Sequence, residues 1–417
     1  MMPGNETPLA TGFTDDVRRG GLTWRERALE RLLGGLVCGR LTVVLPTGAT
    51  FTRSGRDAGP EATLILHRWR AVMRLATGGD IGFAESFMDG DWTSPDLTAV
   101  IRLAACNSGA LQQAIQGSWP IRLANRVRHA LNANSKRGSR RNIEAHYDLG
   151  NDFYSLWLDE SMLYSSAIWT PQTGDLAAAQ QNKLAAIRAA LAPKAGDSVL
   201  EIGCGWGALA AALARDDGAQ ITGLTLSPSQ LAWARDTVAP CGDAVELRIQ
   251  DYRDVMGPFD RIVSIEMFEA VGEAYWPTYF TALKRCLKPE GRVVLQVISI
   301  AEDRFDAYRR ESDFIQKHVF PGGFLPTKTA IRREGERAGL VTTQTQFFGH
   351  SYALTLAAWR RRFMERWPEI AALGFDEQFR RKWDYYFSYC EAGFLEGWID
   401  VGLYTLEHAP AHAPADA

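Results

Sequence analysis

The stretch VLEIGCGWG at residues 199–207 decides the fold of this chain. An apolar run typical of a buried strand ends in three closely spaced glycines, Gly203, Gly205 and Gly207, and an Ala/Leu-rich helix is expected directly after them. Ligands of open α/β sheets lie at the carboxyl ends of the strands, where glycines let a nucleoside-bearing ligand approach bare backbone. The stretch therefore predicts a ligand site where a parallel strand turns into a helix.

From about residue 144 onward, predicted strands alternate with predicted helices. The strand candidates are 198–202, 220–224, 245–249, 261–265 and 292–298, and a late strand is expected at 341–348. Near-continuous apolar strands separated by helices are typical of a parallel, doubly wound sheet, so we predict an α/β fold with a Rossmann-like sheet. Residues 353–406 are rich in Trp, Tyr and Phe and are predicted to be helical.

The N-terminal part predicts a smaller α+β domain. A capping box, Thr23 to Glu26, opens a helix whose apolar positions form one stripe: Leu29, Leu32, Leu33, Leu36 and Val37. Strands are expected at 41–46 and 62–66, and helices at 69–77, 81–88 and 96–106. The predicted domain plan is a disordered tail at 1–21, the small domain at 22–118, a linker at 119–143, the sheet domain at 144–407 and a disordered tail at 408–417.

The linker is basic and has no matching acids. Its cations are Arg122, Arg126, Arg128, Lys136, Arg137, Arg140 and Arg141. One interpretation is a solvated linker. The other is a patch that lies on anionic lipid headgroups, where each basic residue contributes about 1 kcal/mol. RNA binding fits less well, because aromatic residues are not interleaved with the cations.

Bulk composition narrows the class of protein. The net charge is only −3, so no nucleic-acid partner is expected. Six cysteines are scattered without paired spacing, which predicts reduced thiols in a cytosolic protein and no bound metal. No signal peptide or membrane-spanning run is found. Any contact with lipid must come from the surface, which predicts a cytoplasmic protein that is peripheral on the inner face of the membrane.

Four further motifs carry a family resemblance: HYDLGNDF at 146–153, YSSAIW at 164–169, EMFEAVG at 266–272 and FPGG at 320–323. An acid before the glycines, Glu201, gives the form E-x-G-x-G-x-G, which looks like the S-adenosylmethionine (AdoMet) site of a class I methyltransferase and not a nicotinamide site. Together the motifs closely resemble the cyclopropane-fatty-acyl-phospholipid synthase and mycolic acid cyclopropane synthase family. The resemblance covers about residues 144–406 strongly and 22–118 more loosely.

The resemblance and the strand ends predict the residues that bind AdoMet. Tyr164 and Ser165 correspond to residues that cover AdoMet, and Glu201 accepts hydrogen bonds from the loop or attracts the ligand's ammonium group. The other expected ligands are polar or aromatic groups that follow the second and third strands: Thr225, Gln230, Gln250, Asp251 and Tyr252. Two alternatives stay open, because Gln230 also completes a capping box and Asp251 also reads as a solvated loop carboxylate.

Members of the family transfer the methyl group of AdoMet to a cis double bond of a lipid acyl chain. An alkene is a poor nucleophile, so the enzyme must hold it in line with the methyl group at near-attack distance. The resulting carbocation calls for a dry pocket with aromatic faces and carboxylates. A base then removes a proton, which closes the three-membered ring.

The resemblance implies catalytic residues position by position. Glu269 corresponds to a catalytic carboxylate and Tyr352 to a catalytic tyrosine. The family binds bicarbonate as the base, held by this Glu, this Tyr, a backbone group at Ile298, a Cys and a His. Here the Cys is Ser166 and the His is Gln296, which keep hydrogen-bonding capacity but supply no positive charge. A misplaced base would give a methyl-branched chain with a shifted double bond, or an exomethylene lipid, in place of a cyclopropane.

The predicted partner is a phospholipid bilayer with unsaturated acyl chains. The N-terminal domain is expected to dock on the bilayer or to form a homodimer. Two other functions stay open. A small-molecule amine N-methyltransferase would share the HYDLGNDF and FE-x-VG motifs, and an inactive protein that binds AdoMet and lipid would fit the missing Cys and His.

Overall fold

The computed structural model describes residues 12–13, 23–109 and 149–410. The chain forms two compact units. One comprises the described residues of Met1–Asn125 together with Phe375–Glu396, and the other those of Arg126–Gly374 and Gly397–Ala417. The helix α18 (Glu377–Leu395) therefore belongs to the N-terminal unit, although the sequence pattern places it with the sheet domain. The linker cations and His146 lie outside the described residues.

The larger unit contains a mixed, mostly parallel sheet with the strand order β11-β12-β10-β9-β6-β7-β8. Its strands are β6 (Ser198–Ile202), β7 (Gln220–Thr225), β8 (Val245–Ile249), β9 (Phe259–Ile265), β10 (Leu287–Ile300), β11 (Leu340–Phe347) and β12 (Ile399–His408). The strands from β10 to β8 are parallel, and β12 and β11 join their neighbours antiparallel. The predicted Rossmann-like class I sheet is confirmed.

One prediction about this sheet is wrong. Residues 399–406 were expected to be helical, but they form β12, which lies between β10 and β11. The residues from Val401 to Leu406 are buried without interruption. A continuous apolar run of this kind does not distinguish a fully buried strand from a buried helix.

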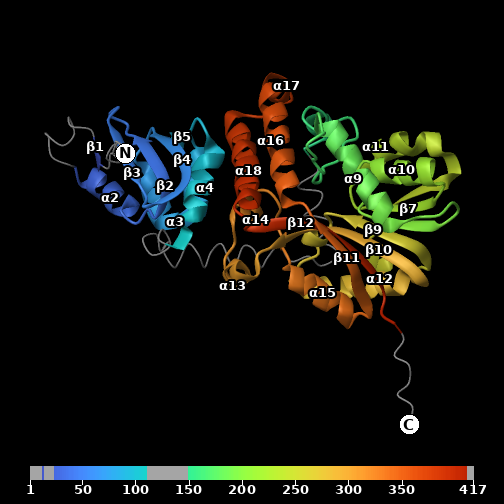
Figure 1. The fold of residues 1–417 in the computed structure, drawn as a ribbon. Coiled ribbons are helices and arrows are strands. Elements are labelled where there is room, and N and C mark those ends of the chain that lie inside the picture. The colour runs from blue at the N-terminus through green and yellow to red at the C-terminus, as the bar shows by residue number, and fades with distance from the viewer. Residues whose placement is uncertain (1–11, 14–22, 110–148, 411–417) are drawn as a thin grey trace, which may run out of the picture. The chain divides into compact units, whose positions relative to one another are not determined.

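Helices cover both faces of this sheet (Figure 1). On one face, α9 (Leu176–Leu191), α10 (Ala208–Asp217) and α11 (Pro228–Val238) form a core with Val199 of β6. On the other face, α12 (Trp276–Cys286) and α15 (Lys328–Arg337) form a core with Leu200. Neighbouring strand residues thus serve opposite cores, as the two-residue period of a strand requires.

Further elements complete the larger unit. They are α8 (Asn151–Ser155), α13 (Glu302–Arg310), α14 (Phe314–His318), α16 (Gly349–Glu365), α17 (Trp367–Ala372) and the 3₁₀ turns η1 (Ala239–Ala244), η2 (Tyr252–Asp254), η3 (Phe268–Ala270) and η4 (Glu273–Tyr275).

The N-terminal unit has a second sheet, with the order β1-β3-β2-β4-β5. Its elements are β1 (Gly12–Phe13), α2 (Trp24–Leu33), β2 (Cys38–Val44), β3 (Thr50–Ser54), β4 (Asp57–Leu66), α3 (Arg70–Met88), β5 (Trp92–Thr93) and α4 (Leu97–Cys106). The capping box at Thr23 and Glu26 is present. Gly79 is non-helical inside α3, where two separate helices were predicted.

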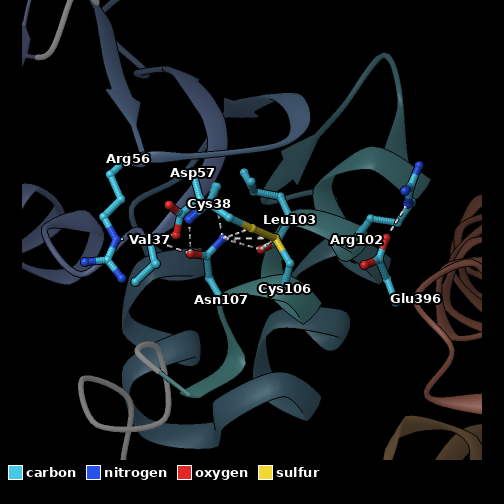
Figure 2. Close-up of a disulfide and its surroundings, with 9 residues drawn as sticks. All are labelled: Val37, Cys38, Arg56, Asp57, Arg102, Leu103, Cys106, Asn107 and Glu396. Carbon is cyan, nitrogen blue, oxygen red and sulfur yellow. Dashed lines mark hydrogen bonds and ion pairs between the residues drawn. A yellow bond between two sulfur atoms is a disulfide. The ribbon is translucent and has the colours of Figure 1, made fainter.

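A disulfide joins the start of β2 to the end of α4, which corrects the prediction that all six cysteines are reduced. Cys38 and Cys106 are bonded although 68 residues separate them (Figure 2). Spacing along the sequence does not reveal this pair, because the two cysteines become neighbours only when α4 packs on β2. The remaining cysteines, Cys204, Cys241, Cys286 and Cys390, form no disulfide.

Asn107 secures the backbone beside this disulfide (Figure 2). Its carboxamide oxygen accepts hydrogen bonds from the amides of Val37 (2.7 Å) and Cys38 (3.0 Å), and its nitrogen donates to the carbonyl of Leu103 (2.8 Å). Because the side chain is 2% exposed, water cannot replace these bonds. We expect Asn107→Ala to lower the free energy of unfolding by about 2–4 kcal/mol in urea titrations. Loss of less than about 0.5 kcal/mol, as for an ordinary surface substitution, would contradict this account.

Candidate active site

The glycine loop after β6 leaves space for a ligand. Gly203, Gly205 and Gly207 have φ values of +86°, +51° and +89°, which side chains other than glycine rarely adopt. A Cβ atom at Gly205 would meet no atom within 4 Å, so the backbone there faces open space. Glu201 is 3% exposed, and its Oε2 atom has no hydrogen-bond partner. Burial raises the pKa of Glu201 to about 8. The open backbone and the orphaned acceptor fit the amino-acid part of AdoMet.

The residues predicted to bind ribose and adenine follow β7 and β8, on the same edge of the sheet as the glycine loop. Thr225 donates to Oε1 of Gln230 (3.0 Å). The backbone amide of Gln230 donates to Ser227 (3.3 Å), but the amide of Ser227 donates to Thr225 (3.1 Å), so the capping box is only half formed. Asp251 forms an ion pair with Arg253 (2.6 Å), in place of the solvated carboxylate that was the alternative.

Two more of these residues lie in the same loop after β8. The side-chain nitrogen of Gln250 donates to the carbonyl of Asp254 (3.1 Å). Burial raises the pKa of Tyr252 to about 12, so its ring is a neutral aromatic wall. Ligand contacts by Gln250, Asp251 and Tyr252 stay predictions.

The segment that contains Tyr164, Ser165 and Ser166 is fixed by α9 and α16. From α9, Gln180 donates to the carbonyl of Ser165 (3.1 Å) and Lys183 donates to its hydroxyl (2.8 Å). From α16, the hydroxyl of Thr355 accepts from the amide of Ala167 (3.2 Å). The segment is therefore held in place by side chains of two helices.

A carboxylate that the sequence analysis did not assign lies at the centre of the predicted catalytic residues. Glu266 follows β9 directly, and its Oε1 atom accepts from the amide of Ser166 (2.8 Å) and from Nε2 of Gln296 (2.7 Å). Its Oε2 atom accepts from the hydroxyl of Tyr352 (2.6 Å). Three of the predicted catalytic positions thus converge on one side-chain carboxylate.

The backbone of Glu266 adopts a conformation that is rare for this residue type. Its φ is +48°, which costs roughly 1–2 kcal/mol for a residue with a Cβ atom. Such strain persists only where the surrounding structure holds it, and it is concentrated at functional sites. The amide of Glu266 donates to the carbonyl of Gln296 (2.8 Å), and its carboxylate is tied by the three donors above. These bonds hold the side chain toward Tyr352.

Glu269, the predicted catalytic carboxylate, has a different environment. Its Oε1 atom accepts from the amide of Ile298 (2.5 Å), the backbone group that was expected to hold bicarbonate, and its Oε2 atom is buried without a partner. Burial and the neighbouring charge of Glu266 raise the pKa of Glu269 to about 8. Burial also raises the pKa of Glu266, but Tyr352, Ser166, Gln296 and the charge of Lys183 oppose this. At neutral pH Glu269 therefore holds its proton, and the hydrogen bonds and the charge of Lys183 favour the ionised form of Glu266 over that of Glu269.

Aromatic rings surround the predicted AdoMet cover. The ring of Tyr164 lies 5.3 Å from Trp359, 5.4 Å from Trp157 and 5.5 Å from Tyr154, measured between centroids. Trp359 in turn lies 6.0 Å from Tyr352, the residue that donates to Glu266. Trp157 and Trp359 are fully buried. The cluster places apolar rings next to Tyr352, an environment that suits a positively charged carbon.

Two residues of this site were not predicted from the sequence. Glu266 stands in the EMFEAVG motif, and its one signal was its place at the end of a strand. Lys183 occupies a position on the apolar face of α9, together with Leu184 and Ile187. The side chain of Ser166 donates to the carbonyl of Ala167, so only its backbone amide reaches Glu266.

Comparisons with known proteins agree on one family. The family model described as mycolic acid cyclopropane synthetase matches residues 134–403. The tuberculostearic acid methyltransferase UfaA1 of Mycobacterium tuberculosis is 41% identical over 363 residues, 84% of each chain. The cyclopropane-fatty-acyl-phospholipid synthase of Escherichia coli strain K12 is 37% identical over 77% of this chain and 81% of its own.

A solved structure is also similar. Mycolic acid cyclopropane synthase CmaA1, crystallised with S-adenosylhomocysteine (SAH) and CTAB, has a TM-score of 0.61 and 29% identity over 64% of this chain and 97% of its own. In the described parts of the present chain, no helix combines the length and apolar character needed to span a bilayer.

Proposed function

Because the chain belongs to the mycolic acid cyclopropane synthetase family of AdoMet-dependent methyltransferases, we propose that it methylates the double bond of unsaturated acyl chains in membrane phospholipids. The phospholipid substrate is supported by the name of the Escherichia coli relative, and by the cationic linker for contact with anionic headgroups. In this proposal the protein reaches its substrate from the membrane surface.

The observation that carries the proposal is the position of the Glu266 carboxylate. The resemblance assigns bicarbonate to a site formed by Tyr352, Glu269, a backbone group at Ile298 and the positions of Ser166 and Gln296. Here Tyr352, Gln296 and the Ser166 amide donate to Glu266. We propose that this tethered carboxylate replaces the free anion as the base.

The chemistry needs a methyl donor, a base and a dry pocket. AdoMet, when bound, supplies an electrophilic methyl group. Addition of a methyl group to an alkene leaves a positive charge on the neighbouring carbon, which the rings of Tyr164 and Trp359 stabilise in the absence of water. Glu266 then accepts a proton from the lipid cation, and protonated Glu269 limits the negative charge next to it.

Atom balance limits the product. Adding a methyl cation and removing a proton extends the acyl chain by CH2 and keeps one unsaturation or one ring. We propose a methyl-branched chain with a migrated double bond or an exomethylene chain, supported by the side-chain base and by the name of the tuberculostearic acid relative. A fully saturated branch would need a reductant that this reaction does not supply.

Vesicles of a cis-monounsaturated phospholipid test the substrate class. With AdoMet, the released acyl chains should gain CH2, as measured by mass spectrometry. Saturated phospholipid vesicles and a panel of soluble amines serve as matched controls and should gain nothing. Methylation of an amine in the absence of any lipid product would replace this proposal with an N-methyltransferase.

The raised pKa of Glu269 predicts a pH-dependent stability. A carboxyl with a pKa of about 8 in the folded state and 4.5 when unfolded binds its proton more tightly in the folded state, so its contribution to stability falls as pH rises from 4.5 to 8. We expect the free energy of unfolding of Glu269→Gln, relative to that of wild type, to increase by at least about 1 kcal/mol from pH 5 to pH 8. Urea unfolding at the two pH values measures this difference. An unchanged difference between the two proteins at the two pH values would show that Glu269 titrates normally.

A further inference from the structure

Lys183 is a buried cation that the proposed chemistry does not use directly. It is 0% exposed, and among the described residues it is the one buried lysine, arginine or histidine. Its ammonium donates to the hydroxyl of Ser165 (2.8 Å) and forms no ion pair in the described part of the chain. Since an ammonium group carries three donors, two remain for a ligand.

Three acids create a negative field around this lysine. The charges of Glu266, Asp159 and Glu201 all favour the protonated form of Lys183, while burial lowers its pKa to about 8. A ligand carboxylate that approached these acids would be repelled by them unless a cation received it. Lys183 is placed to be that cation, because its partner Ser165 belongs to the segment predicted to cover AdoMet.

The amino-acid end of AdoMet carries both an ammonium and a carboxylate group. The unpartnered Oε2 of Glu201 fits the ammonium. We infer that Lys183, together with the hydroxyl of Ser165, binds the α-carboxylate of AdoMet. The inference rests on the AdoMet dependence of the family and not on the identity of the lipid product, so it stands or falls separately from the proposed substrate.

Binding of a carboxylate beside Lys183 has a measurable consequence for protons. At pH 8 the free protein holds Lys183 partly deprotonated, and a bound anion would favour the ammonium form. The ligand's ammonium group favours the ionised form of Glu201, so it causes proton release and not uptake. That group is common to AdoMet and to decarboxylated AdoMet. The difference in proton uptake between the two ligands therefore isolates the carboxylate.

Calorimetric titration of the full chain at pH 8 tests this with AdoMet and decarboxylated AdoMet, in buffers of different ionisation enthalpy. Wild type should bind AdoMet about 10–100-fold more tightly than the decarboxylated ligand, the range expected for a charge-assisted hydrogen bond. It should also take up more protons with AdoMet. Lys183→Met should lose this preference and bind the two ligands alike, whereas the exposed Lys194→Met control should retain it.

Three outcomes would overturn the inference. Lys183→Met could lower the affinity for both ligands equally, which would indicate a structural role. It could leave affinities unchanged and move only the pH profile of methyl transfer, which would make Lys183 an electrostatic partner of Glu266. If the variant does not fold, the proton measurement on wild type decides, and equal proton uptake with both ligands would exclude Lys183 as the carboxylate receptor.

Discussion

Glu266→Gln should lower the turnover number about 100–10,000-fold, the range expected when a general base is removed. Glutamine keeps the size of the side chain and an oxygen for the amide of Ser166, but it cannot accept a proton from the lipid cation. The AdoMet affinity should fall by much less than the turnover number, because the Glu266 carboxylate bonds Ser166, Gln296 and Tyr352 and not the glycine loop. Single-turnover kinetics and calorimetry measure the two effects.

A second substitution at the same position tests whether a free anion can replace the carboxylate. Glu266→Gly relieves the left-handed backbone strain, because glycine adopts a positive φ readily. It leaves Tyr352, Gln296 and the Ser166 amide without their acceptor, and added formate or bicarbonate should restore part of the turnover. Near wild-type turnover of Glu266→Gln would contradict a role as the base.

Tyr352→Phe should lower turnover about 10–100-fold, as expected for loss of a hydrogen bond to a charged group. The hydroxyl lies 2.6 Å from Oε2 of Glu266 and holds the pKa of that carboxyl down. Without it the pKa of Glu266 rises, so the acid limb of the pH–rate profile should move to higher pH. Profiles of kcat and kcat/KM measure the shift.

A matched phenol provides the control for this variant. Tyr385 is 3% exposed on α18, in the other unit, and Tyr385→Phe should leave both the rate and the profile unchanged. A slower Tyr352→Phe enzyme with an unshifted acid limb would mean that the phenol acts on the substrate and not through Glu266.

Local patterns predicted most of the larger unit. The apolar strand, the glycines and the following helix at 198–217 are all formed by near neighbours in sequence, and they are confirmed. The missed strand β12 depends on two partners, β10 and β11, that lie 52 or more residues before it in the chain. The disulfide of Cys38 was missed for the same reason, because pairing across 68 residues leaves no local signal.

The sequence predicted residues for the candidate site but not how their side chains pair. The sequence places Glu266 and Glu269 three residues apart, and spacing alone does not show which carboxylate meets Tyr352. The positive φ of Glu266 decides this, by turning its side chain toward α16 while Glu269 reaches the amide of Ile298. Lys183 was missed because helical periodicity assigns its position to the core.

In the proposed reaction a lipid alkene is methylated and Glu266 removes the proton. The most direct measurement incubates wild type and Glu266→Gln with AdoMet and cis-monounsaturated phospholipid vesicles, then analyses the acyl chains by mass spectrometry before and after catalytic hydrogenation. Wild type should yield chains that gain CH2 and then take up H2 to give a methyl branch, and the variant should yield almost none. Equal yields from the two proteins, or unaltered acyl chains with wild type, would contradict the account.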